Sequence, residues 1–176
     1  ARIGQGSLGG KARGLAFMSS ILQENTSLFE KYSESTIRIP QTLVLSADVF
    51  EEFVGSNKLK RFAADGYTDE EVAQAFLQAE IPGRVVSDLH TYLEQVVYPL
   101  SVRSSSLLED ARFQPYTGLY ESYMIPNNNP DLSRRLEFLI NAVKLVYAST
   151  YYQKPKAFTK STAGQARDES MAVIIQ

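Results

Sequence analysis

The sequence predicts an α+β fold in which helices pack against an antiparallel or mixed sheet. Apolar, β-branched runs alternate irregularly with helical apolar periods, and several predicted helices cluster between the second and third predicted strands. A doubly wound parallel sheet would instead alternate strands and helices regularly. The length of 176 residues and the 44% hydrophobic content are typical of one globular domain, so we expect a single domain over residues 1–176.

The chain is predicted to begin with a helix and to continue through β-rich segments into a second helix. Apolar residues recur at helical spacing over 9–23, directly after a pair of glycines. Two β-rich runs, 37–39 and 42–45, are separated by a Pro-Gln pair. Ser46 is then expected to be the N-cap of a helix over 47–54.

Three more helices are predicted before the next strand. Residues 58–64 form a short basic candidate that ends at an Asp-Gly turn. Thr68 and Glu71 have the spacing of a capping box, and the helix that it opens is expected to run to about Glu80. After a Pro-Gly break, apolar residues at helical spacing predict a helix over 84–97.

The rest of the chain is predicted to contain three strands and the longest helix. The ranges are a strand at 100–104, a loop at 105–118, a strand at 119–125, a helix at 131–151, an irregular or weakly helical segment at 152–170 and a strand at 171–176. The predicted loop has more than ten residues, a length that is often functional in a domain of this size.

Charge and composition exclude several classes of function. The formal net charge of -2 gives no overall positive field, which argues against binding to nucleic acid or to a membrane surface. The absence of cysteine excludes thiolate metal sites and fits a cytoplasmic location. No apolar run is long enough to predict a membrane span. The only histidine, His90, has no catalytic partner nearby in the sequence and is expected to be structural or exposed.

The two ends of the sequence favour an interpretation of the chain as part of a longer protein. The chain begins without methionine in a glycine-rich segment, and it ends in an apolar run over 171–176. A natural domain seldom ends inside what should be a buried strand.

The glycine-rich segment Gly4–Lys11 is the first candidate for chemistry. Glycines let backbone amides approach an anion, and the helix N-terminus and Lys11 add positive charge, a combination that suits phosphate. The dinucleotide fingerprint lacks its leading strand, because only three residues precede the first glycine. The P-loop pattern fails at Gln5 and Ala12. On this segment alone, a flexible linker before a helix with a surface lysine is equally compatible.

A second candidate is the end of the strand at 100–104. It delivers Arg103 and the serines at 104–106 to the start of the predicted loop, where the guanidinium could bind phosphate bidentately. Glu109 and Asp110 could bind a metal ion or pair with Arg103, and a solvated acidic turn is the alternative for them. An exposed arginine at a strand end is the alternative for Arg103.

Taken together, four segments in this order resemble one family. They are Gly9–Leu15 (GGKARGL), Ile39–Thr42 (IPQT), Val102–Asp110 (VRSSSLLED) and Met171–Gln176 (MAVIIQ). They are similar to the N-terminal ATP-binding domain of phosphoenolpyruvate synthases, pyruvate phosphate dikinases, glucan water dikinases and rifampin phosphotransferases. The resemblance implies the N-terminal lobe of an ATP-grasp-type nucleotide-binding domain, a partial domain over 1–176.

The resemblance also implies a role for individual residues. Lys11 and Arg103 correspond to the lysine and arginine that contact the ATP phosphates and act in catalysis. The further ATP-binding positions that it implies are Ser104, Gly118, Ser122 and Gln176, the last at the adenine side of the cleft. Tyr116 and Thr117 replace an aromatic residue and an alanine of the family's loop, and Ser122 replaces a threonine.

The activity implied is that of an ATP-dependent phosphotransferase, a kinase or dikinase. It passes a phosphoryl group from ATP through a carrier histidine on another domain to pyruvate. ATP and Mg²⁺ are the expected cofactors, and the magnesium ligands are expected outside this chain, so no metal ligand is assigned here. The partners implied are the second half of the ATP-grasp fold, the phosphohistidine domain and the pyruvate-binding domain, and the chain by itself is expected to be inactive. The alternatives are a non-catalytic nucleotide-sensing or interaction module and a dinucleotide-binding dehydrogenase.

Overall fold

A mixed five-stranded sheet lies at the centre of the computed structural model, which describes residues 1–27, 39–106, 118–161 and 170–176. The strand order is β1-β2-β5-β3-β4, with bounds Arg2–Ile3 (β1), Leu43–Leu45 (β2), Leu100–Ser106 (β3), Ser122–Ile125 (β4) and Met171–Ile175 (β5). β1 is parallel to β2, and the other neighbouring pairs are antiparallel. The predicted α+β fold class is confirmed.

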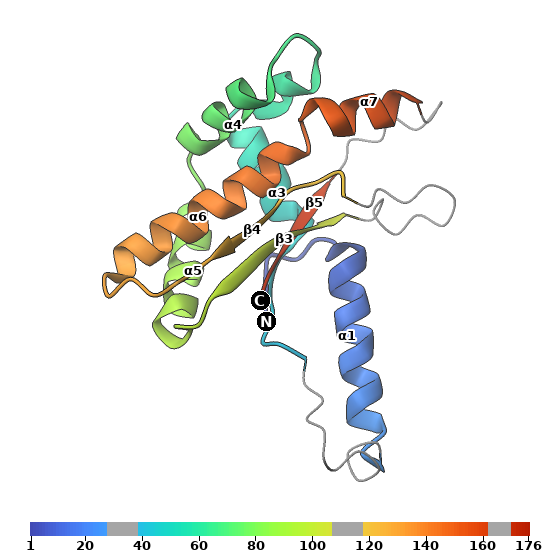
Figure 1. Ribbon diagram of the computed structural model, residues 1–176, viewed down its shortest axis with the longest axis vertical. Helices are drawn as coiled ribbons and strands as arrows, with labels where there is room; N and C mark the ends of the chain where they lie inside the picture. The colour runs from blue at the N-terminus through green and yellow to red at the C-terminus, as the bar shows by residue number, and fades with distance from the viewer. Residues whose placement is uncertain (28–38, 107–117, 162–169) are drawn as a thin grey trace.

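The helices divide unequally between the two faces of the sheet (Figure 1). Their bounds are Gly9–Glu24 (α1), Ala47–Ser56 (α3), Asp69–Gln78 (α4), Gly83–Gln95 (α5), Leu132–Ser149 (α6) and Gln153–Ser161 (α7), with a 3-10 helix at Leu59–Ala63 (η1). The helices α3, α5 and α6 cover one face, and α4 packs against α6. The other face is covered only where α1 packs on it, among the described residues.

The central strand β5 explains why the apolar run near the end of the sequence is continuous. Met171, Val173 and Ile175 point into the main core beneath α3 and α6, while Ala172 and Ile174 pack against Ala12 of α1 on the opposite face. Because both faces of this strand are covered, all five of its residues are buried. The predicted terminal strand is confirmed.

Two predicted helix starts differ in outcome. The capping box is confirmed, since the Glu71 amide donates to Thr68 Oγ1 (3.2 Å) and the Thr68 amide donates to Glu71 Oε2 (2.8 Å). Ser46 occupies the N-cap position of α3, but its hydroxyl does not cap that helix. It donates instead to the Ile3 carbonyl (2.8 Å) and to Asp48 Oδ1 (2.6 Å).

Strand ends differ from the predictions because pairing decides where a strand stops. β3 continues through Ser105 and Ser106, which pair with Ala172 and Met171 of β5, although the sequence predicts these serines in the loop. β4 begins at Ser122, not at 119. The rest of the predicted loop, 107–117, lies outside the described residues.

A short strand precedes the glycines, contrary to the sequence-based expectation. The amide of Val44 donates to the Ala1 carbonyl (3.1 Å) and the amide of Ser46 donates to the Ile3 carbonyl (3.0 Å), which forms β1. A strand of two residues is too short to show an alternating pattern. Only its pairing with β2 reveals it.

Other differences are local. The predicted irregular or weakly helical segment contains the helix α7, where Pro155 is tolerated because a first-turn amide has no intrahelical acceptor. Residues 162–169 lie outside the described part of the chain. Of the predicted strand at 37–39, residues 37 and 38 also lie outside it, and Ile39 has no regular structure.

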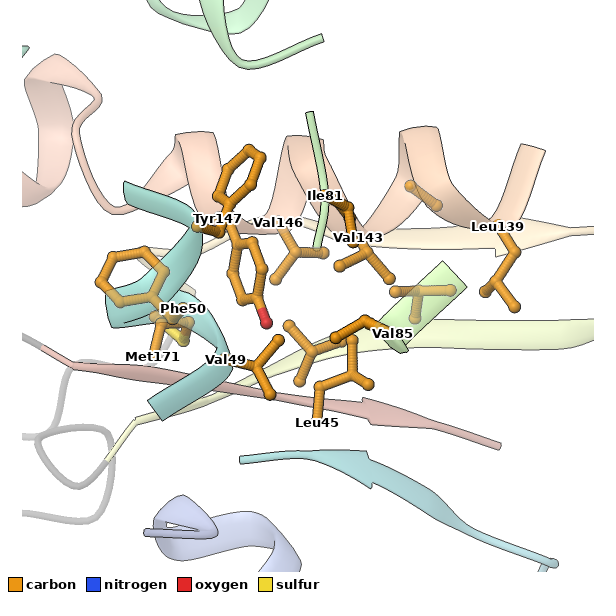
Figure 2. Close-up of a cluster of buried hydrophobic side chains, with 14 of the residues drawn as sticks. Leu45, Val49, Phe50, Ile81, Val85, Leu139, Val143, Val146, Tyr147 and Met171 are labelled. Atoms are coloured by element: carbon orange, nitrogen blue, oxygen red, sulfur yellow. The ribbon is translucent and has the colours of Figure 1, made fainter. Parts of the chain in front are cut away.

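The main core lies between the sheet and α3, α5 and α6 (Figure 2). Tyr147 of α6 is fully buried there and packs edge-on against Phe50 of α3, with ring centroids 5.1 Å apart. Its hydroxyl oxygen, red in Figure 2, has no hydrogen-bond partner in the structure as described. Burial raises the pKa of Tyr147 well above its ordinary value, so the group stays neutral.

Removing that hydroxyl should not destabilise the protein. Because a buried, unpaired hydroxyl costs about 1 kcal/mol or more, Tyr147→Phe is expected to leave the free energy of unfolding unchanged or to raise it by about 1 kcal/mol. Ser149→Ala is the matched comparison, since the buried Ser149 hydroxyl accepts from the Glu121 amide (3.2 Å) and donates to the Val146 carbonyl (2.7 Å). It should lose about 1 to 2 kcal/mol. Urea denaturation measures both free energies of unfolding. An equal loss of stability in Tyr147→Phe and Ser149→Ala would contradict the conclusion that the Tyr147 hydroxyl lacks a hydrogen-bond partner.

Candidate functional site

The start of α1 rests directly on the end of β3. A Cβ atom at Gly9 would lie 1.7 Å from the carbonyl oxygen of Ser105, and Gly9 has a φ of +71°, so only glycine fits. The Ser105 hydroxyl accepts a hydrogen bond from the Ala12 amide (3.2 Å) and donates one to the Leu8 carbonyl (2.9 Å). A side chain of β3 thus bridges the amide and the carbonyl that would form the first hydrogen bond within α1.

This contact delivers Lys11 to β3. Lys11 lies in the first turn of α1, and its Nζ donates to the Ser104 carbonyl (3.1 Å) and to Ser104 Oγ (3.4 Å). Ser104 is buried and is the residue that follows Arg103. Two candidate residues 93 positions apart in the sequence, Lys11 and Ser104, are therefore in contact.

Arg103 lies on the same face of the sheet as α1. It pairs with Ile174 of β5, which packs against Ala12 of α1, and with Ser122 of β4. Paired residues of an antiparallel sheet project to the same side, so Arg103 and Ser122 are neighbours on this face. The Arg103 side chain is exposed, and among the described residues no hydrogen bond or ion pair holds its guanidinium.

The remaining two candidates lie at different places. Gln176 exchanges backbone hydrogen bonds with Ser101 (3.0 and 2.7 Å), and its Nε2 donates to Thr42 Oγ1 (3.1 Å). By alternation from Ile174 it shares the α1 face with Arg103. Gly118 is tied to α7 instead, because its carbonyl accepts from Lys154 Nζ (2.8 Å). Glu109, Asp110, Tyr116 and Thr117 lie outside the described residues.

The segment Gly4–Leu8, which we name the glycine loop, already binds an anion from its own chain. The amides of Gln5 and Gly6 donate to the Asp48 carboxylate (2.9 Å each), at the start of α3. Partial burial raises the pKa of Asp48, but hydrogen bonds from Ser46 and from these two amides outweigh it and lower the pKa from 3.8 to about 2. The interpretation of glycines that let amides approach an anion holds, but the anion found there is a carboxylate.

The sequence does not reveal Asp48 as part of this region, nor the contact of Ser105 with α1. The only local signal for Asp48 is a carboxylate in the first turn of a helix after a strand, a common helix-start feature. Its acceptor role depends on a loop about 40 positions earlier in the sequence. Ser105 is visible in the serine run, but its hydrogen bonds to α1 follow only from the fold.

Searches of the described residues for metal clusters and for membrane-spanning helices give negative results. In the part of the chain that the structure describes, no group of three or more His, Cys, Asp or Glu side chains could hold a metal ion. None of the helices described is both long and apolar enough to cross a membrane. His90 is partly exposed on α5, with its Nδ1 3.5 Å from Glu94 Oε1.

The close approach of Gly9 predicts an unequal response of two glycines in α1. Gly9→Ala is expected to lower the free energy of unfolding by about 2 kcal/mol or more, because the methyl group meets the Ser105 backbone and the positive φ is strained. Gly14→Ala, where a Cβ meets nothing within 4 Å, should raise it by up to about 1 kcal/mol. Thermal and chemical denaturation check both, and equal effects would show that Gly9 is not confined.

The low pKa of Asp48 predicts a stability loss in acid. A carboxyl group whose pKa is lower in the folded state than in the unfolded state stabilises above its unfolded pKa, here 3.8, and this contribution disappears as the pH falls toward 2. Because the carboxylate is partly exposed, we expect a contribution of about 1 kcal/mol. Asp48→Asn should therefore lose less stability than the wild type between pH 4.5 and 2.5. Parallel pH profiles of the two proteins would contradict the low pKa.

A comparison with protein-family models finds a match over most of the chain. The family model described as the pyruvate phosphate dikinase AMP/ATP-binding domain matches residues 5–176. A search of curated proteins finds no match. The match covers nearly the whole chain, including Lys11, Arg103 and the glycine loop from Gln5 onward. The chain therefore belongs to the pyruvate phosphate dikinase AMP/ATP-binding domain family, and it is an ATP-binding domain of a phosphotransferase of that kind.

Proposed function

We propose that Lys11 and Arg103 bind the phosphates of ATP on the α1 face of the sheet, in a phosphotransferase that passes a phosphoryl group through a carrier histidine on another domain to pyruvate. The observation that supports it is the convergence of α1 and β3. Lys11 Nζ contacts the residue after Arg103, and α1, which carries Lys11, packs on the face to which Arg103 projects. Two cations that meet at consecutive residues of one strand suit a polyphosphate.

The arrangement along β3 also suits a nucleoside triphosphate. Lys11 Nζ contacts Ser104 near one end of β3, and Gln176 pairs with Ser101 near the other end. Three residues of strand separate these positions by about 10 Å, a distance that an extended ATP molecule can bridge. We propose that the phosphates lie toward Lys11 and the adenine toward Gln176.

The hydroxyl groups near the two cations fit the same proposal. Ser122 lies opposite Arg103 on the exposed part of β4, where its hydroxyl can donate to a phosphate oxygen bound by the guanidinium. Ser104 already shares its carbonyl and hydroxyl with Lys11, so it orients the ammonium group. Gly118 would contribute through the loop that precedes β4.

The described residues supply cations and hydroxyl groups but no acidic cluster for magnesium. Phosphoryl transfer requires metal ions and positioned cations to stabilise the charge that moves between oxygens. We propose that the magnesium ligands come from the second half of the ATP-grasp fold, together with the phosphohistidine and pyruvate-binding domains. The part played by this domain is then to bind and orient ATP.

Removing either cation should weaken both ATP binding and transfer in the intact protein. Arg103→Ala is expected to reduce ATP affinity and carrier-histidine phosphorylation roughly hundredfold, the range for loss of a charge-stabilising donor. Lys11→Ala should reduce affinity roughly tenfold or more. Calorimetric titration with ATP and radiolabel transfer from ATP to histidine measure the two effects.

Arg134→Ala is the matched control, because it also removes one arginine, and Arg134 is exposed on α6 in an ion pair with Glu137 (2.9 Å). It should leave both quantities unchanged. Normal affinity and transfer in both cation variants would reject the proposal. Normal ATP binding without any histidine phosphorylation in the wild type would favour a nucleotide-sensing module.

A further inference from the structure

The Asp48 carboxylate holds the glycine loop from two sides. Asp48 Oδ2 accepts from the Gln5 amide, and Oδ1 accepts from the Gly6 amide (2.9 Å each). Oδ1 also accepts from the Ser46 hydroxyl (2.6 Å), which donates in addition to the Ile3 carbonyl at the end of β1. The carboxylate therefore connects β1, the glycine loop and α3.

The contact between the loop and α3 is reciprocal. While Asp48 accepts from two loop amides, the Ser7 carbonyl accepts from the Ala47 amide (2.9 Å), the first amide of α3. There is no space for a side chain at the contact. A Cβ at Gly4 would lie 2.2 Å from Ser46 Oγ, and one at Gly6 would lie 2.7 Å from the Asp48 amide nitrogen. The path of the loop is thus set by hydrogen bonds and by close packing together.

The loop leads into Lys11 within a few residues. Gly6 is fixed by Asp48, Gly9 is packed on Ser105, and Lys11 follows in the same helical turn. The start of α1 is held by the Gly9 contact and by the hydrogen bonds of Ser105, and the glycine loop is the segment that brings the chain to this contact. A displacement of the loop would therefore move Lys11 relative to Arg103.

We propose that Asp48 is a positioning residue for ATP binding, because its hold on the glycine loop places Lys11 beside Arg103. This inference rests on the proposed role of Lys11 in binding phosphate. Asp48 itself contacts no ligand in this arrangement. It also occupies the amides of Gln5 and Gly6, so these amides are not the groups that bind ATP.

Electrostatic repulsion alone predicts the opposite effect of removing the Asp48 charge. The direction of the change in ATP affinity therefore distinguishes the two explanations. A negative charge near bound phosphates weakens their binding by repulsion. In addition, the amides of a loop that is no longer bound to Asp48 could donate to phosphate. If electrostatic repulsion dominated, Asp48→Asn would tighten ATP binding. If positioning dominates, Asp48→Asn weakens it, since the neutral amide side chain cannot accept from both loop amides.

The test is a double-mutant cycle on the intact protein, with ATP affinity measured by calorimetric titration. Asp48→Asn is expected to weaken ATP binding about fivefold to tenfold in the wild-type background and less than about twofold in the Lys11→Ala background. A purely structural role would give the same factor in both backgrounds. Asp69→Asn is the matched control, because Asp69 also accepts a distant backbone amide, from Gln153 (2.7 Å), at the start of a helix. It should leave ATP affinity unchanged.

The outcomes separate this inference from the proposed function. Unchanged affinity in Lys11→Ala overturns the proposed role of Lys11. Weaker binding in Lys11→Ala together with unchanged or tighter binding in Asp48→Asn overturns only the positioning role of Asp48, as does an Asp48→Asn effect of equal size in both backgrounds. If Asp48→Asn does not fold, Ser46→Ala replaces it in the cycle, because it keeps the carboxylate but removes one of its hydrogen bonds. Ser46→Ala should weaken ATP binding about twofold to threefold when Lys11 is present and less in the Lys11→Ala background. If Ser46→Ala leaves ATP affinity unchanged, the inference is overturned.

Discussion

The approach of Gly9 to the backbone of Ser105 is the constraint on which the candidate site depends. It brings the first turn of α1 onto the last residues of β3, where the Ser105 hydroxyl bridges the Ala12 amide and the Leu8 carbonyl. The rest of α1 is largely exposed, so the helix is held on the sheet mainly at its start. The helix end that carries Lys11 is thereby the best fixed part of α1, which is the requirement for a side chain that must meet a ligand in one geometry.

Internal hydrogen bonding decides which groups remain for a ligand. The glycine loop has the composition of a phosphate-binding loop. However, the Asp48 carboxylate accepts hydrogen bonds from two of its amides, and the Ser7 carbonyl accepts one from the first amide of α3. The amides of Gln5 and Gly6 already donate to a carboxylate. A phosphate would have to displace this charged group to bind there. Arg103 is different, because its guanidinium is exposed. Side chains, rather than loop amides, are thus the groups suited to bind phosphate.

Sequence patterns predict what is local and miss what depends on contact. The periods of α1, α4 and α6, the capping box at Thr68 and the buried strand β5 all follow from neighbouring residues. β1, the extension of β3 to Ser106 and the unexpected partners of Ser46 exist only because distant segments pair. The same division applies to the site. Lys11 and Arg103 can be found from motif resemblance, whereas Asp48 and the contact of Ser105 with α1 cannot, since these hydrogen bonds join residues 42 and 93 positions apart.

The uneven cover of the sheet explains why a ligand could reach these cations at all. On the α1 face, the helix packs over Val44, Ala172 and Ile174, which belong to β2 and β5. Pairing places Arg103, Ser122 and Met124 on the same face but on β3 and β4, and Met124 is 80% exposed. Among the described residues, Arg103 therefore lies at the boundary between the part of the face that α1 covers and the part that it does not, and Lys11 Nζ contacts the next residue of β3. A ligand bound there would contact a helix start, two strands and both cations at once, a surface that neither the sheet nor α1 provides alone.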